Sequence, residues 1–200
     1  MVVGTATATA TATAMPLKLL VMGVSGCGKS TLAEAVAARL GASMIEGDAF
    51  HPAANVERMR RGIALTDADR EPWLDALGAR LASENGDAVL SCSALKRAYR
   101  ARLRDAVPGL RIVFIEVTPD DANARVSARA SHFLSPALVT DQFATLEPPT
   151  GEAGVLRVDG RWSTVAQCDA VLAWLAREIA NKKSPDTAPE TLPKTSPLVP

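Results

Sequence analysis

The chain has 200 residues, of which 48% are apolar, and its 22 basic residues balance 22 acidic ones. This length and apolar content favour one folded domain, and the balanced charge gives no support to a nucleic-acid or membrane partner. No apolar run approaches the roughly 20 residues of a membrane span. Three cysteines without metal-like spacing favour a reducing, cytoplasmic setting over a disulfide framework.

The two ends of the chain differ in composition from its middle. Residues 5–14 are five Thr-Ala repeats, without the basic start and apolar core of a signal peptide. The segment from residue 183 onward holds five of the chain's 13 prolines, mixed with polar residues. Such segments cannot bury enough apolar surface to fold. We therefore predict disordered extensions at 1–16 and 182–200, and one folded domain over 17–181.

The first predicted strand, 17–22, leads into a glycine-rich loop that is followed by a helical pattern. The loop, residues 23–30, fits the Walker A pattern, whose glycines let backbone N–H groups point into one phosphate-binding concavity. In this pattern Lys29 reaches the β- and γ-phosphates, and the Ser30 hydroxyl binds Mg²⁺. A chance glycine-rich turn is the alternative, but the strand–loop–helix context argues against it. We predict that ATP binds at Gly23, Val24, Ser25, Gly26, Cys27, Gly28, Lys29, Ser30 and Thr31.

Strand-like and helical segments alternate through the rest of the domain. One helix is predicted to carry Pro72 in its first turn, and another begins at the cap signal Thr118-Pro119. The alternation implies an α/β fold with a parallel five-stranded sheet covered by helices on both faces. The further predicted strands are 42–45, 88–92, 111–117 and 155–158, and the further predicted helices are 52–61, one that contains Leu74, Leu77 and Leu81, 96–107, one from about 119, and 165–179.

Polar residues follow the second predicted strand, at the edge where ligands of parallel sheets bind. Asp48 should project toward the γ-phosphate, where its carboxylate could accept the proton of an attacking hydroxyl or hold Mg²⁺ through water. Glu46 points to the same side of an extended chain and is a second candidate near Mg²⁺. Capping of the next helix is the alternative for both carboxylates. His51 is a candidate by its position on the same loop.

Several cations surround the predicted phosphate site. Lys96 and Arg100 lie four residues apart on one helical face just past the third strand. Further arginines flank the second predicted strand. So many cations near a phosphate site indicate either an anionic co-substrate or simple surface charge, and the residue composition does not distinguish these two interpretations. The cations near the second strand are Arg58, Arg60, Arg61 and Arg70.

Two further arginines, Arg125 and Arg129, lie four residues apart at the end of the helix that starts near residue 119. The segment that follows, 130–136, lacks a regular pattern. Small P-loop kinases place such arginines in a mobile lid, where they neutralise charge on the transferring phosphoryl group and exclude water. The alternative is a pair of solvated arginines on a helix surface.

Several distinctive blocks of sequence are spread over residues 17–180 and cover nearly the whole predicted domain. The Walker loop is one of them and would be unspecific alone. The further blocks are Gly47-Asp48-Ala49-Phe50-His51-Pro52 with Asn55 and Met59, Leu65-Thr66-Asp67-Ala68-Asp69-Arg70-Glu71-Pro72-Trp73-Leu74, Cys92-Ser93-Ala94-Leu95-Lys96 with Tyr99-Arg100, Ser131-His132-Phe133, and Leu138-Val139-Thr140-Asp141-Gln142-Phe143-Ala144-Thr145-Leu146-Glu147-Pro148. In their sequence and their order, these blocks resemble the gluconate kinase family.

The resemblance implies ATP- and Mg²⁺-dependent phosphorylation of D-gluconate at its C6 hydroxyl, which gives 6-phospho-D-gluconate and ADP. It also implies a fold similar to shikimate and adenylate kinases, a lid at about 125–140, and a homodimer. By this resemblance Asp48 is the catalytic base beside Lys29, and Arg125 and Arg129 belong to the lid. The residues that would hold gluconate are Asp48, His51, Arg58, Arg70, Lys96 and Arg100.

Two features depart from the family pattern. Glu46 stands where family members have Asp, which leaves its magnesium role open, and the terminal extensions carry no inherited function. Two rival interpretations remain at this point. One is another small-metabolite kinase of the same fold, and the other is a nucleotide-binding switch that has no acceptor substrate.

Overall fold

The computed structural model describes residues 15–128 and 136–183. In these residues strands and helices alternate, and each strand begins and ends within one residue of its predicted limits. The strands are β1 (Lys18–Met22), β2 (Ser43–Glu46), β3 (Ala88–Ser91), β4 (Arg111–Glu116) and β5 (Val155–Asp159). The helices are α1 (Lys29–Leu40), the short 3₁₀ helix η1 (Gly47–Phe50), α2 (Ala53–Arg60), α3 (Asp67–Ala82), α4 (Arg97–Ala106), α5 (Pro119–Ser127), α6 (Pro136–Thr145) and α7 (Thr164–Lys183).

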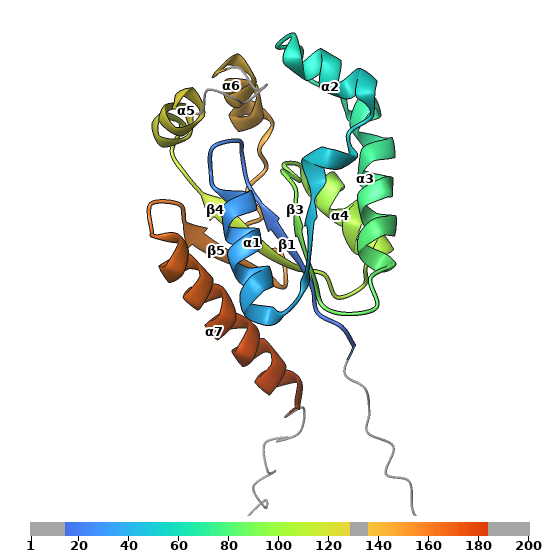
Figure 1. The fold of residues 1–200 in the computed structure, drawn as a ribbon, viewed down its shortest axis with the longest axis vertical. Coiled ribbons are helices and arrows are strands. Elements are labelled where there is room, and N and C mark those ends of the chain that lie inside the picture. The colour runs from blue at the N-terminus through green and yellow to red at the C-terminus, as the bar shows by residue number, and fades with distance from the viewer. Residues whose placement is uncertain (1–14, 129–135, 184–200) are drawn as a thin grey trace, which may run out of the picture.

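The described strands form one parallel sheet in the order β2-β3-β1-β4-β5, which confirms the predicted fold class. The central strand β1 pairs on both sides, so that Leu20 lies beside Leu90 of β3 and Ile112 of β4. Helices cover both faces of the sheet (Figure 1). A parallel sheet covered in this way buries its strands on both faces, and for this reason their sequences read as continuous apolar runs.

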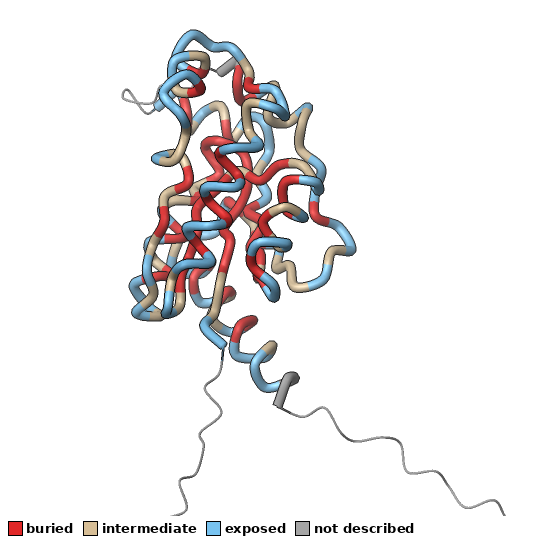
Figure 2. Tube along the Cα trace, turned by 90° about the vertical axis from the view of Figure 1, so that its right-hand side faces the viewer, coloured by how far each residue is buried: buried red, intermediate tan, exposed pale blue. Residues whose placement is uncertain are grey.

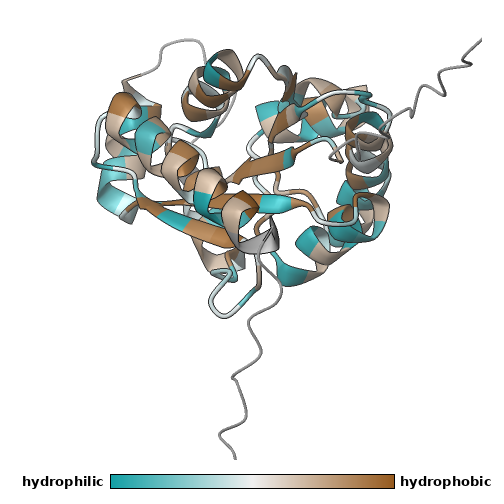
Figure 3. Ribbon diagram, turned by 90° about the horizontal axis from the view of Figure 1, so that it is seen from below, coloured by the Kyte–Doolittle hydropathy of each residue, from teal (hydrophilic) through white to brown (hydrophobic). Residues whose placement is uncertain are grey.

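The two faces of the sheet build two hydrophobic cores from alternate residues of each strand. In β1, Leu19 and Val21 belong to the core shared with α1 and α7, whereas Leu20 and Met22 belong to the core shared with α3 and α4. All four side chains are fully buried. Figure 2 shows the buried residues gathered along the strands, and Figure 3 shows hydrophobic strands between helices whose outer faces are hydrophilic.

Helix α3 begins earlier than the sequence analysis predicts. The Thr66 hydroxyl accepts a hydrogen bond from the Asp69 N–H, and the Asp69 carboxylate accepts one from the Thr66 N–H. This capping box satisfies backbone donors that the helix start would otherwise leave free, so the helix begins at Asp67. Pro72 therefore lies inside the helix, and its predicted place in the first turn is wrong.

Several predictions fall wholly or partly outside the described residues. The Thr-Ala segment, the proline-rich tail and the segment 129–135, which includes Arg129, are among them. Helix α6 begins in the region predicted as a lid and continues beyond it to Thr145, and no helix is predicted there; helix α7 continues to Lys183. No helix in the described ranges combines the length and the apolarity needed to cross a bilayer.

The loop that follows β1 lies at the carboxyl-terminal edge of the sheet. Helices α2, α5 and α6 lie at this same end of the molecule, whereas the end of α7 lies at the opposite end (Figure 1). In open parallel sheets, ligands bind in the crevice beyond the carboxyl ends of the strands. The fold thus brings the Walker loop, η1 and three helices to one edge.

Candidate active site

The loop between β1 and α1 has a backbone that favours glycine. Gly26 and Gly28 have φ values of 83° and 99°, in the left-handed region. A Cβ on Gly26 would lie 2.5 Å from the carbonyl oxygen of Ala122 in α5, so no side chain fits between the loop and that helix. Helix α1 then starts at Lys29. The loop and the helix N-terminus together form an arrangement that binds phosphate oxygens.

Lys29 is a buried cation, with 8% of its surface exposed. Burial alone would lower the pKa of its ammonium group, but the nearby carboxylates of Asp48 and Glu46 outweigh this effect and raise the pKa above its ordinary value. Lys29 therefore stays charged between the loop and the end of β2. The hydroxyl oxygens of Ser30 and Ser91 lie 3.3 Å apart, which places Ser30 against the end of β3.

Helix η1 carries Asp48 directly after β2. The Glu46 carboxylate accepts a hydrogen bond from the Asp48 N–H at 3.4 Å and so caps this helix, as the alternative interpretation of Glu46 expects. The buried Trp73 of α3 donates its indole N–H to the Gly47 carbonyl at 2.8 Å. A Cβ on Gly47 would lie 2.4 Å from the Ser91 carbonyl oxygen. The backbone under Asp48 is thus fixed from β2, β3 and α3.

Two adjoining cavities meet at Asp48. The first, which we call the phosphate pocket, is formed by the Walker loop, the start of α1 and Val126 of α5. The second, which we call the side cavity, lies beside it and is open to solvent. Ser25, Lys29 and Asp48 line both cavities. The side cavity is also lined by His51, Met59, Leu65, Arg70, Trp73, Ser93, Leu95, Leu138, Asp141 and Gln142.

His51 is held in the side cavity as a neutral ring. It stacks on Trp73 with ring centres 4.1 Å apart and planes at 15°. Burial lowers the pKa of His51 to about 4, with Asp48 opposing the shift and Arg70 adding to it. Its Nδ1 is buried and has no hydrogen-bond partner among the described residues. A neutral imidazole offers one donor and one acceptor, so His51 can serve a ligand hydroxyl in this cavity.

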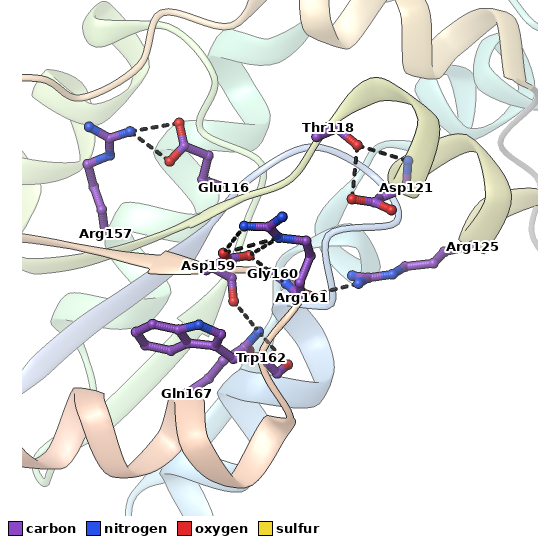
Figure 4. A network of polar contacts seen from close by, with 10 residues as sticks. All are labelled: Glu116, Thr118, Asp121, Arg125, Arg157, Asp159, Gly160, Arg161, Trp162 and Gln167. Carbon is purple, nitrogen blue, oxygen red and sulfur yellow. Dashed lines mark hydrogen bonds and ion pairs between the residues drawn. The ribbon is translucent and has the colours of Figure 1, made fainter.

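Arg125 joins the Walker loop to the connection between β5 and α7. Its Nη2 donates to the Gly160 carbonyl at 2.7 Å, and its Nη1 lies 3.4 Å from the Cys27 carbonyl oxygen. Figure 4 shows this side chain reaching from α5 toward Gly160. In the same connection, Arg161 pairs with the Asp159 carboxylate at 2.6 Å. These contacts place the Arg125 cation against the Walker loop, on the α5 side of the phosphate pocket. Residues of α2 and α3 line the side cavity instead.

Several known proteins are similar in sequence to this chain. A family model described as an AAA domain matches residues 19–149. The gluconokinase of Gluconobacter oxydans is 47% identical over 149 residues, which are 72% of this chain and 83% of that protein. The chain belongs to the gluconokinase family. The thermoresistant gluconokinase of Escherichia coli is 42% identical over 144 residues, which are 70% of this chain and 82% of that protein.

The fold agrees with this family assignment. The crystal structure of a gluconokinase from Sinorhizobium meliloti 1021 matches this structure with a TM-score of 0.77 at 44% identity. The match covers 85% of this chain and 98% of that protein. The family and the P-loop kinase fold that the sequence blocks implied are therefore confirmed.

Within this gluconokinase-family fold, four residues predicted from the sequence come together in the side cavity. They are Lys29, Asp48, His51 and Arg70. The Arg70 Nη1 donates to the Leu65 carbonyl at 2.6 Å, which anchors the guanidinium at the cavity wall. A carboxylate, a neutral imidazole and two cations thus face one space, a set that suits a hydroxylated anion.

Arg58 and Lys96 do not line the side cavity. The Nε of Arg58 lies 3.7 Å from the Asp69 carboxylate, and the Nζ of Lys96 lies 2.7 Å from the Asp67 carboxylate. Both predicted substrate residues are therefore paired with the first turn of α3. The sequence analysis did not foresee this pairing, because the turn is defined by the capping box that it missed.

Arg100 also lies away from the side cavity, where the structure gives it a structural setting. Its side chain is 1% exposed, and its Nε donates to Glu152 at 3.0 Å. Its Nη1 donates to the carbonyls of Ala94 and Leu95 at 3.0 and 2.9 Å. Arg104 pairs with the same Glu152 at 2.7 Å. The guanidinium of Arg100 thus holds the turn after β3 instead of facing a ligand.

We expect Glu152→Gln to destabilise the protein by about 3 kcal/mol at pH 7, because it leaves the buried Arg100 without its counter-charge. Burial would raise the pKa of Glu152, but Arg100 and Arg104 outweigh it and hold the pKa below its ordinary value of 4.5. A carboxyl whose folded-state pKa is depressed stabilises above its unfolded-state pKa, and this stabilisation is lost as the pH falls through the folded-state pKa.

Urea unfolding of both proteins from pH 7 to pH 3 tests this expectation. The difference in unfolding free energy between wild type and Glu152→Gln should shrink as the pH falls below about 4.5. Asp75→Asn, which removes an exposed partner of Arg102, is the matched control and should destabilise the protein much less, because solvent screens exposed ion pairs. A difference that stays constant with pH would contradict the assigned ion pair.

Sequence reasoning assigned no role to several residues that line the side cavity. Ser93 and Leu95 follow β3, and Leu138, Asp141 and Gln142 come from α6. All five lie in blocks that resemble the family, so the signal was present as similarity. The three residues of α6 could not be placed, because without a predicted helix no face could be assigned to their side chains.

Proposed function

We propose that this gluconokinase-family chain transfers the γ-phosphoryl group of ATP to the C6 hydroxyl of D-gluconate. The observation that supports it most is the meeting of the phosphate pocket and the side cavity at Ser25, Lys29 and Asp48. A donor in one and an acceptor in the other would place the two reacting oxygens on opposite sides of the γ-phosphorus. In-line transfer requires this arrangement.

In the proposed reaction, the C6 oxygen forms a bond to the γ-phosphorus while the bond to the oxygen bridging the β- and γ-phosphates breaks. Asp48 accepts the proton of the C6 hydroxyl, and ADP leaves with the bridging oxygen. Lys29 stabilises the charge on the β- and γ-phosphate oxygens. The products are 6-phospho-D-gluconate and ADP.

The carboxylate and hydroxyls of gluconate would be bound by the far wall of the side cavity. Arg70 supplies a cation for the carboxylate, and arginine binds carboxylates with paired hydrogen bonds. His51 supplies a neutral donor and acceptor for a hydroxyl. Stacking on Trp73 fixes the plane of the imidazole, so a hydroxyl that binds there meets a ring in one orientation.

Mg²⁺ fits the residues beside the phosphate pocket. It is bound in nucleotide enzymes through one or two protein groups, with phosphates and waters as its other ligands. The Ser30 hydroxyl would bind it directly and Asp48 through water, and the described residues hold no group of three acidic, Cys or His side chains that could hold a metal alone. When bound, it would neutralise charge on the phosphates. Arg125 lies beside the Walker loop, so in this proposal it would bind phosphate oxygens of ATP.

A coupled assay of ADP release tests the proposed function. Purified full-length protein with ATP and Mg²⁺ should release ADP with D-gluconate and show at least tenfold lower kcat/KM with shikimate, adenylate or pantothenate. Phosphorus NMR of the product should show a new phosphate monoester. ADP release that does not depend on gluconate would overturn the proposal, and nucleotide binding without any acceptor turnover would favour a nucleotide-binding switch.

The family resemblance also leads us to propose a homodimer in the cytoplasm. Size-exclusion chromatography with light scattering should give the mass of two chains. The mass of one chain at micromolar concentration would contradict the dimer.

A further inference from the structure

Helix α6 contacts the Walker loop through one side chain. The Oε1 atom of Gln142 accepts a hydrogen bond from the Ser25 backbone N–H at 2.7 Å. Ser25 is 4% exposed and lines both the phosphate pocket and the side cavity. The residues are 117 positions apart in the chain. Gln142 therefore bonds the loop at the point where the two cavities meet.

The packing of α6 turns Gln142 inward. Leu138 and Val139 lie one helical turn before it, and side chains three and four residues apart share a helix face. Val139 is fully buried in the core that includes α1 and α7. Leu138 is buried against Met59 and Leu65, which approach from α2 and from the segment before α3. Val139 thus packs this face of α6 onto the core of the sheet, and Leu138 packs it onto α2 and the segment before α3.

The hydrogen bond to Ser25 also fixes what Gln142 can offer to a ligand. A carboxamide has one oxygen that accepts and one NH₂ group that donates. Only the oxygen can accept from the Ser25 N–H, so this hydrogen bond fixes the positions of the Oε1 and Nε2 atoms of Gln142. Gln142 lines the side cavity together with Asp48, His51 and Arg70. Its remaining capacity toward a molecule in this cavity is that of a donor.

We infer that Gln142 is a substrate-positioning residue that links the two halves of the site. Its oxygen holds the Ser25 amide of the Walker loop, and its NH₂ group donates to a hydroxyl oxygen of a polyhydroxy acid in the side cavity. This inference rests on the proposed function, because it assigns the acceptor to this cavity. Helix α6 then contributes to recognition of the acceptor, because its Gln142 binds a hydroxyl near the end of the acceptor that reacts.

Gln142→Glu separates this role from a purely structural one. A glutamate has nearly the same shape and can still accept from the Ser25 N–H, but it has no NH₂ group and carries a negative charge toward an anionic acceptor. The KM for gluconate should rise about tenfold or more, from a lost hydrogen bond together with charge repulsion. The dissociation constant of ADP, which has no γ-phosphate, should change less than threefold.

Ala144→Glu is the matched control, because it adds the same charge to an exposed position of the same helix. Its KM for gluconate should stay within twofold of wild type. Gln142→Ala, which loses both contacts, should also raise the KM, and thermal unfolding of each variant reports on its folding. If Gln142 only braces the Walker loop, Gln142→Glu keeps the brace, and a wild-type KM for gluconate would overturn the inference.

The outcomes also separate this inference from the proposed function. If wild-type protein turns over gluconate and Gln142→Glu has an unchanged KM, only the inference fails. If wild-type protein phosphorylates none of the polyhydroxy acids offered, the proposed function fails and the inference fails with it. A raised KM for gluconate with an unchanged ADP dissociation constant supports both.

Discussion

Replacing Asp48 with asparagine should lower kcat for gluconate phosphorylation by roughly 10²-fold or more, the usual effect of removing a positioned base. Asparagine is nearly isosteric but cannot take the proton of the C6 hydroxyl. The backbone at this position is held by the Glu46 cap and by the Trp73 hydrogen bond to Gly47, and neither depends on the Asp48 carboxylate. The protein should therefore fold normally, and its affinity for ATP should remain within a few-fold of wild type.

Steady-state kinetics with gluconate and a separate titration of ATP binding check this expectation. Asp75→Asn makes the same chemical change at an exposed position of α3 and should leave kcat unchanged. An Asp48→Asn enzyme with kcat within threefold of wild type would show that another group accepts the proton. If the variant loses both ATP binding and kcat, Asp48 contributes to binding of ATP and not to activation of the acceptor.

Replacing Lys29 with alanine should reduce kcat/KM by roughly 10²- to 10³-fold or more, since Lys29 is the buried cation that faces the phosphates. Its pKa is held above the ordinary value because the carboxylates of Asp48 and Glu46 outweigh the effect of burial, so it is charged throughout the working pH range. Without it, these two carboxylates would repel an incoming ATP. We therefore expect ATP affinity to fall as well, in contrast to Asp48→Asn.

Kinetics and calorimetric titration with ATP measure both effects. Lys18→Ala is the matched control, because Lys18 lies at the opposite end of β1, where its ammonium donates to the Glu84 and Gly86 carbonyls. This variant should keep wild-type kcat/KM even if its stability falls. A Lys29→Ala enzyme that retains more than a tenth of wild-type kcat/KM would mean that the phosphate site is assigned to the wrong loop.

Local sequence patterns predicted the strands of this protein well because each buried strand is a short apolar run bounded by turn residues. They predicted the start of α3 poorly. The capping box of Thr66 and Asp69 defines that start, and reading Pro72 as a first-turn residue placed it too late. Helix α6 was missed, since apolar and polar residues mix along it without a clear period.

The cations illustrate the limit of sequence reasoning for the site. Arg70 and Arg100 both occur in blocks that resemble the family, and both were predicted to bind substrate. Arg70 lines the side cavity, whereas Arg100 is buried against Glu152, 52 residues away. The type of a residue gives its charge, but the partner of that charge depends on which distant segment packs beside it.

The family, the order of the strands and the phosphate-binding loop could all be predicted from the amino-acid sequence alone. These depend on local features, namely apolar periodicity and glycines whose backbone conformation other residues rarely adopt. Three contacts could be found only in the folded molecule: Gln142 accepts a hydrogen bond from Ser25, Glu152 neutralises Arg100, and His51 is buried on Trp73 with a lowered pKa. Such contacts join residues far apart in the chain, and burial sets their strength, so they exist only once the helices have packed on the sheet.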